Sequence, residues 1–141
     1  MLNKVTLIGR IGRAPETRRM SSGDQVMNFS IATDEKWRDK STGEKREKTE
    51  WHNVVVFSER VINFLERYAE KGTQLYVEGA LQTRKWTDQS GQERYTTEVV
   101  VKQFNGDVKI IQGGKRNDDA PSQHQEPDQK TPADLDDDIP F

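Results

Sequence analysis

Five short strand-like runs, interrupted by one segment of helical spacing, limit the folds open to this chain. The runs cover residues 4–8, 26–33, 50–57, 74–82 and 95–101. In the second run Met27, Phe29 and Ile31 fall on one face, which is the pattern of a half-buried strand. Residues 61–69 change to helical spacing before Lys71-Gly72, which predicts one short helix between the third and fourth strands.

This order of elements is typical of an all-β domain built as a five-stranded Greek-key barrel, the OB-fold. In that architecture the binding face lies on the middle strands, and the loops joining strands one to two and four to five flank it. The charged segment 34–48, which contains Trp37, and the segment around Asp88-Gln89-Ser90-Gly91, next to Trp86, are then expected to be long charged hairpins.

Charge divides the chain near residue 112. The formal net charge is −2, but residues 1–112 carry 19 basic and 16 acidic side chains, whereas residues 113–141 carry three and eight. Residues 113–132 have almost nothing apolar to bury and cannot offset their ordering entropy. We therefore predict a folded domain at 1–112, a disordered linker at 113–132 and an acidic interaction tip at 133–141.

Composition excludes several other kinds of protein. No apolar run approaches about 20 residues, so no transmembrane helix is expected, and the N-terminus lacks the pattern of a secretion signal. The absence of cysteine excludes disulfides, a thiol nucleophile and a thiolate metal site. We expect a cytoplasmic protein that has no cofactor, no bound metal and no catalytic residue.

The tryptophans stand in unusual surroundings. Trp37 and Trp86 each lie in a long charged segment without apolar partners at core spacing. On the third strand, Trp51 and Phe57 share one face, while valines fill the other. The alternatives are an ordinary core position for Trp51 and Phe57, and a loop-stapling role for Trp37 and Trp86.

Exposed aromatic rings among cations suit unpaired nucleobases. Every base has a π-face that a ring can accept without reading sequence, whereas in a duplex neighbouring bases already cover these faces. Basic side chains beside the rings can follow the phosphates. The pattern therefore predicts binding of single strands, with phosphate contacts from Lys36, Arg38, Lys40, Arg84, Lys85 and Arg94.

The same features leave other functions open. RNA offers the same π-faces, so an RNA-binding OB-fold module is the alternative function. A metal-dependent nuclease would need the carboxylates of residues 136–138, which lie in a tip without the fixed surroundings a catalytic metal requires. A protein adaptor would use only the tail, which leaves the tryptophans unexplained.

Longer motifs cover both the folded part and the C-terminal end. They are Trp37-Arg38-Asp39-Lys40, Thr49-Glu50-Trp51-His52, Tyr76-Val77-Glu78-Gly79, Thr83-Arg84-Lys85-Trp86-Thr87-Asp88-Gln89-Ser90-Gly91 and the final residues Asp136, Asp137, Asp138, Ile139, Pro140 and Phe141. In these motifs the sequence resembles the bacterial single-stranded DNA-binding proteins of the homotetrameric type.

The resemblance implies roles for particular residues. Trp37, Trp51, Phe57 and Trp86 would be the stacking platforms for single-stranded DNA. His52 would lie near a subunit interface of a homotetramer, the alternative being a strand histidine satisfied within its own chain. The protein would act at the nucleoid in DNA replication, recombination and repair.

Two positions depart from the family pattern. Phe57 is followed by Ser58-Glu59, where relatives often carry a basic residue, and Gln82 stands where a further arginine is common. Each departure removes a phosphate contact from the expected set, although the stacking residues are intact.

The C-terminal tip joins three aspartates to Ile139-Pro140-Phe141. An acidic tail that serves only solubility does not explain this apolar ending. The tip suits an apolar pocket rimmed by Arg or Lys on a partner protein. The resemblance implies that it recruits replication, repair and recombination enzymes.

Overall fold

The structure is a computed structural model that describes residues 1–114. Its elements in chain order are β1 (Val5–Ile11), β2 (Glu16–Arg19), β3 (Gln25–Arg38), β4 (Lys45–Val56), α1 (Glu59–Tyr68), β5 (Gln74–Thr87), β6 (Glu93–Val101) and β7 (Asp107–Gln112). Apart from residues 113 and 114, the predicted linker lies outside the described residues, and so does the predicted tip at 133–141.

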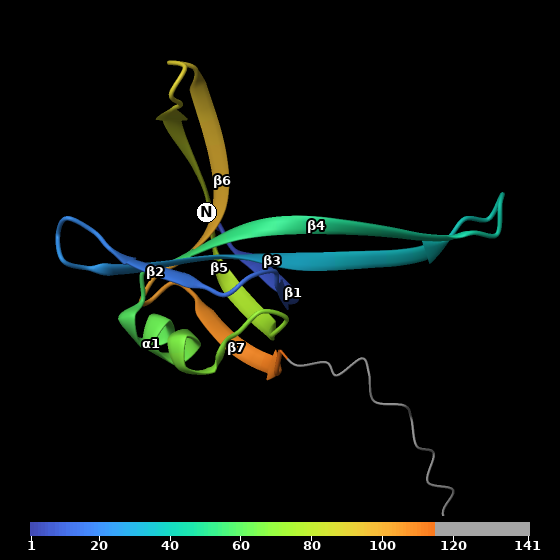
Figure 1. Cartoon of the computed structure of the whole chain (residues 1–141), viewed down its shortest axis with the longest axis horizontal. Coiled ribbons are helices and arrows are strands. Elements are labelled where there is room, and N and C mark those ends of the chain that lie inside the picture. Colours follow the sequence, from blue (N-terminus) through green and yellow to red (C-terminus); the bar gives the residue numbers. More distant parts are fainter. Residues whose placement is uncertain (115–141) are drawn as a thin grey trace, which may run out of the picture.

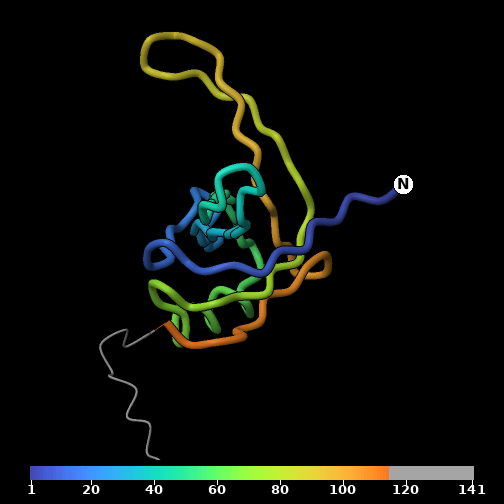
Figure 2. The backbone as a smooth tube through the Cα atoms, turned by 90° about the vertical axis from the view of Figure 1, so that its right-hand side faces the viewer, coloured from blue at the N-terminus to red at the C-terminus, as the bar shows by residue number. Residues whose placement is uncertain are grey.

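Five strands close into a barrel (Figure 1, Figure 2). β1 pairs with both β3 and β5, and the ring continues from β3 through β4 and β6 to β5. Every pairing in this ring is antiparallel except β4 with β6. Because α1 lies between the third and fourth barrel strands, β4 and β5, the predicted five-stranded OB-fold barrel with one helix is confirmed.

The core forms where the inward faces of the strands meet α1. Successive side chains of a strand point to opposite sides, so each strand gives every second residue to the interior. The buried residues include Met27, Phe29 and Ile31 of β3, Val54 and Val56 of β4, Leu75 and Val77 of β5, and Val61, Ile62 and Leu65 of α1. None of the helical segments within residues 1–114 is long and apolar enough to cross a membrane.

The charged segment 34–48 forms the long hairpin that the sequence indicated, and strand pairing continues through most of it, beyond the predicted strand ends at residues 33 and 50. β3 and β4 continue beyond the barrel as a paired ribbon, and β5 and β6 form a second ribbon that projects in another direction (Figure 1). In the first ribbon Glu35 faces Lys48 and Lys36 faces Glu47. A side-chain hydrogen bond across this ribbon runs from Oγ1 of Thr49 to Oδ1 of Asp34, at 2.8 Å, whereas Lys48 forms its ion pair with Glu50 of its own strand.

Both ribbons end in the same kind of turn. Oδ1 of Asp39 accepts hydrogen bonds from the backbone N and the Oγ of Ser41, at 2.8 and 2.6 Å. Oδ1 of Asp88 accepts the equivalent bonds from Ser90, at 2.9 and 2.6 Å. These bonds hold the pKa of both carboxyl groups below the usual range, and that of Asp88 falls to about 2.

Two strands were not predicted. β2 adds to the edge of the barrel by pairing with β3, and β7 by pairing with β5. β2 has the sequence Glu16-Thr17-Arg18-Arg19, which contains no apolar residue and therefore gives no alternating pattern.

Candidate nucleic-acid interface

One side of the sheet brings together four of the predicted residues, from two different ribbons, and we call it the outer face. Directly paired residues point to the same side of a sheet, so the register defines this face. It comprises Asn28, Ser30 and Ala32 of β3, Trp51, Asn53 and Val55 of β4, Arg94, Thr96, Glu98 and Val100 of β6, and Arg84 and Trp86 of β5. The outer face therefore runs continuously from one ribbon to the other.

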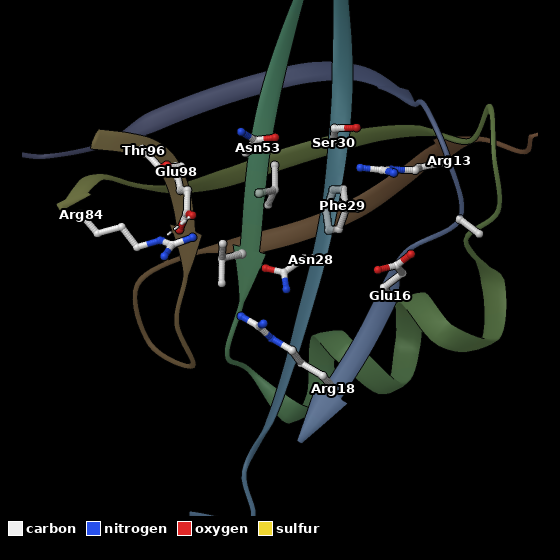
Figure 3. Close-up of a pocket in the computed structure, with 13 residues that line it drawn as sticks. Arg13, Glu16, Arg18, Asn28, Phe29, Ser30, Asn53, Arg84, Thr96 and Glu98 are labelled. Atoms are coloured by element: carbon white, nitrogen blue, oxygen red, sulfur yellow. Dashed lines mark hydrogen bonds and ion pairs between the residues drawn. The ribbon is translucent and has the colours of Figure 1, made fainter. Parts of the chain in front are cut away.

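A pocket of about 310 Å³ lies in the middle of the outer face (Figure 3). Arg13, from the loop after β1, Arg18 of β2 and Arg84 of β5 line it from three different elements. Asn28 and Asn53 also line the pocket. This surface combines cations with amide groups that both donate and accept hydrogen bonds, which suits contacts with phosphates and base edges.

Trp51 lies on the outer face beside this pocket, and 59% of its surface is exposed. Its indole ring is seated against Gly12. A Cβ at residue 12 would overlap the ring and come within 2.8 Å of its Cη2. The Trp51 ring can occupy this position because glycine at residue 12 has no Cβ.

Trp86 is held in place within the β5–β6 ribbon while 42% of its surface stays exposed. Its Nε1 donates a hydrogen bond to Oγ1 of Thr96, at 2.7 Å. Arg94 stands directly opposite Trp86 in the register. The Nε of Arg94 donates to Oδ2 of Asp88 at 3.0 Å, so the turn of the ribbon fixes this cation.

Phe57 and Trp37 lie at the two ends of this region. Phe57 directly follows β4, is 41% exposed and lines a second pocket of about 300 Å³. Trp37 is 48% exposed and pairs with Arg46, which places it on the opposite side of the β3–β4 ribbon from Trp51. A nucleic-acid strand that contacts both Trp37 and Trp51 must therefore pass around an edge of the β3–β4 ribbon.

The six predicted phosphate-contacting residues divide into two groups. Arg84, Lys85 and Arg94 form ion pairs with Glu98, Glu93 and Asp88, at 2.9, 2.8 and 3.0 Å respectively. Lys36, Arg38 and Lys40, on or beside the β3–β4 ribbon, form no ion pair with any residue of the described chain. The β3–β4 ribbon thus offers cations that need not leave a carboxylate before they meet a phosphate.

His52 is half-buried on the side of β4 opposite Trp51. Its Nε2 lies 2.8 Å from Oγ1 of Thr33, within hydrogen-bond distance. One nitrogen of the ring is thus satisfied within the chain, and the predicted place of His52 at a subunit interface stays a prediction.

Several residues of this surface were not predicted from the sequence. Arg13 and Arg18 lie in a segment that reads as turn and loop, so nothing marked them as facing the sheet. Asn28 could have been found, because it alternates with the buried Met27 and Phe29. Tyr95 is 68% exposed and faces Lys85 on the other side of the β5–β6 ribbon, and only its charged surroundings could have indicated it.

Comparison with known proteins agrees with this geometry. Residues 2–107 match the model of the single-strand binding protein family. The chain is 49% identical to the single-stranded DNA-binding proteins of Rickettsia felis and Rickettsia prowazekii, over 99% of this chain and 97% of each relative. A solved Plasmodium falciparum SSB in complex with ssDNA superimposes with a TM-score of 0.71 at 40% identity, covering 79% of this chain and 96% of that one. The chain belongs to the single-strand binding protein family.

Proposed function

We propose that this chain binds single-stranded DNA without reading its sequence, as a binding protein and not an enzyme. The observation that carries the proposal is the set of exposed rings, Trp37, Trp51, Phe57 and Trp86, at least 41% exposed each. Rings of this size are costly to leave in water unless a ligand covers them. Bases are suitable ligands, because stacking requires a free π-face and no particular edge.

Stacking accounts for the preference for single strands. In a duplex each base already stacks on its neighbours, so the rings can engage only a base that has been freed. A protein that binds the separated strand and not the duplex shifts the equilibrium toward the separated strand. Bound strands are in this way kept apart and covered during replication, recombination and repair.

The phosphates of the bound strand contact the basic side chains of this surface. A strand that crosses the outer face meets Arg13, Arg18 and Arg84 at the central pocket. It meets Lys36, Arg38 and Lys40 along the β3–β4 ribbon. Release of counterions from the strand then makes the affinity fall as salt rises, with a slope of about −0.7 per phosphate neutralised.

Titration with oligo(dT), followed by tryptophan fluorescence at several salt concentrations, tests the proposal. We expect strong quenching, and Trp51→Ala should weaken binding by roughly 1–3 kcal/mol, the range for one stacked base in single-strand binders of this type. Phe104→Ala serves as a matched control, since Phe104 is exposed but lies outside the outer face, in the loop between β6 and β7. Equal losses in both variants would contradict the assignment.

RNA binding is tested with a matched pair of oligomers. Oligo(dU) and oligo(rU) carry the same base and differ only at the 2′ position, so the ratio of their affinities isolates the sugar. We expect oligo(dU) to bind more tightly. Tighter binding of oligo(rU) would favour the alternative, an RNA-binding OB-fold module.

The proposed assembly is a homotetramer. Among residues 1–114, residues 5–8 of β1 pair with β5 on one edge only, since β3 pairs with β1 at Arg10 and Ile11. An open strand edge with an exposed Ile8 beside it suits pairing with another copy. Native mass spectrometry should give four times the chain mass of 16.3 kDa. A monomer at micromolar concentration would contradict this part of the proposal.

The C-terminal tip is proposed to recruit genome-maintenance enzymes. Asp136, Asp137 and Asp138 would meet basic side chains at the rim of a partner pocket, and Phe141 would enter it with its carboxylate. A chain that ends at residue 132 should still coat DNA but should no longer stimulate a repair enzyme on that coated DNA. The tip also has the charge to cover the basic outer face, in which case the same deletion raises DNA affinity at low salt.

A further inference from the structure

The pocket around Phe57 differs in charge from the rest of the interface. The pocket lies between the β2–β3 turn and the start of α1. Its charged lining residues are Arg19, Asp24 and Glu59, and Gln25 and Gln103 add two side-chain amides. Two carboxylates therefore stand against one guanidinium beside Phe57. In the central pocket three guanidiniums stand against two carboxylates, and in the pocket that Trp37 lines four cations stand against one carboxylate.

The Glu59 carboxylate is free to meet a ligand. Its side chain is exposed, and it makes no hydrogen bond or ion pair with another residue between 1 and 114. Oδ2 of Asp24 accepts a bond of 3.2 Å from Oγ of Ser22, and Arg19 donates to the carbonyl oxygen of Gly23 at 3.5 Å. Asp24 and Arg19 each form a side-chain hydrogen bond within the turn, whereas Glu59 is the charged side chain of the pocket that forms none with residues 1–114.

This arrangement disfavours a phosphate and favours one kind of base edge. A carboxylate only accepts hydrogen bonds, and it repels a phosphate oxygen. The exocyclic amino groups of cytosine and adenine donate hydrogen bonds, and a carboxylate is a suitable acceptor for cytosine N4. The carbonyl O4 of thymine or uracil at the same position brings two acceptors together, which is unfavourable.

We propose that the Phe57 pocket is a base-reading subsite, in which Glu59 is the specificity-determining residue and selects bases that carry an exocyclic amino group. The ring of Phe57 stacks on the base, and Glu59 accepts a hydrogen bond from the amino group. The amides of Gln25 and Gln103 can each donate or accept, so they accommodate the rest of the base edge. The proposal rests on the proposed function and adds a local preference to otherwise sequence-tolerant binding.

Oligo(dC) and oligo(dU) of equal length provide the test. Both place a pyrimidine of the same size on every ring, but they differ at C4 in having an amino group or a carbonyl. The affinity of the full chain for each is measured at the same salt, and the dC/dU affinity ratio is compared between variants. Because homopolymers fill every subsite with one base, the binding register does not affect the comparison.

Glu59→Gln should lower the dC/dU ratio by about two- to tenfold, the range for the loss of one hydrogen bond. Glu59→Asp keeps the carboxylate and should retain part of the preference. Glu66→Gln is the matched control, since it makes the same change on the exposed surface of α1 outside the pocket, and its ratio should equal that of the unchanged protein. Thermal unfolding of each variant shows whether α1 is intact.

Two results would overturn the proposal. If Glu59→Gln raises the affinity for both oligomers equally, Glu59 only repels phosphates and reads nothing. If the ratio does not change at all, the pocket does not contact a base edge. Failure of the proposed function is distinguishable from both, because neither oligomer would then quench tryptophan fluorescence in the unchanged protein.

Discussion

The indole Nε1 of Trp86 donates a hydrogen bond to Oγ1 of Thr96 across the β5–β6 ribbon, at a distance of 2.7 Å. The bond satisfies the polar atom of the ring and fixes its orientation, while 42% of the residue stays open to a ligand. A stacking ring that is already oriented loses less conformational entropy when a base binds. The position of Thr96 therefore bears on affinity without requiring contact with DNA.

Thr96→Val removes this bond and keeps the shape of the side chain. Because the bond already exists in the free protein, we expect DNA affinity, measured by titration with oligo(dT), to fall by no more than the net value of one hydrogen bond, about 0.5–1.5 kcal/mol. Thr97→Val is the control, because Thr97 lies on the other side of the ribbon and is bonded to Thr83. A larger loss in the control than in Thr96→Val would show that the ribbon as a whole, and not the Trp86 ring, was disturbed.

Gly12→Ala should displace the Trp51 ring. The new methyl group would occupy the space of the indole, so we expect a loss of affinity of roughly 1–3 kcal/mol if stacking at Trp51 fails. Gly113→Ala is the matched control, since a Cβ there meets nothing within 4 Å. Tryptophan fluorescence of the free protein provides the direct measurement, because a moved ring changes its emission before any DNA is added.

The barrel could be predicted from the sequence because its signals are local. The alternation of Met27, Phe29 and Ile31 and the helical spacing around Leu65 each report burial on one side of one element. The two charged hairpins were predicted as well, but the length over which their strands pair could not be predicted in this way. Contacts across a ribbon, such as the hydrogen bond from Thr49 to Asp34, join residues 15 positions apart, and they become visible only when the two strands are paired.

In the candidate site, too, features marked by local sequence were predicted, and features that depend on strand pairing were not. Trp37 and Trp86 are identified from their own neighbours in the chain, because a large ring in a charged segment is unusual. By contrast, the side of the ribbon on which a ring lies depends on the pairing register of the two strands. The sequence therefore did not predict that Trp37 and Trp51 lie on opposite sides of the β3–β4 ribbon. The place of Arg18 on a paired edge strand was likewise not predictable.

The two groups of cations should differ in their contribution to salt dependence. Arg38 forms no ion pair within the described residues, so Arg38→Gln should reduce the magnitude of the salt slope by about 0.7 if it neutralises one phosphate. Lys85 must first leave Glu93, at 2.8 Å, so Lys85→Gln should change the slope less. The comparison requires oligo(dT) titrations of both variants at four or more salt concentrations. Identical slopes for the two would contradict a role for the ion pairs.

Acid should loosen the end of the β5–β6 ribbon within a defined pH window. The hydrogen bond from the Ser90 side chain, followed by the bond from Arg94, lowers the pKa of Asp88 from 3.8 to about 2. Because this pKa is depressed in the folded state, the stabilisation is present above pH 3.8 and is lost as the pH falls through about 2. Amide hydrogen exchange at Ser90 and Gln92, whose N–H groups both donate to Oδ1 of Asp88, measures the change directly.

The Asp88→Asn variant separates this effect from general acid unfolding. Asparagine keeps an acceptor oxygen for Ser90 but does not titrate, so exchange at the turn should show no step between pH 4 and pH 2 beyond the intrinsic pH dependence of exchange. The charged bond to Arg94 is lost in the variant at every pH, which frees that cation opposite Trp86. If Asp88→Asn shows the same acid-dependent step as the unchanged protein, another carboxyl group controls the turn.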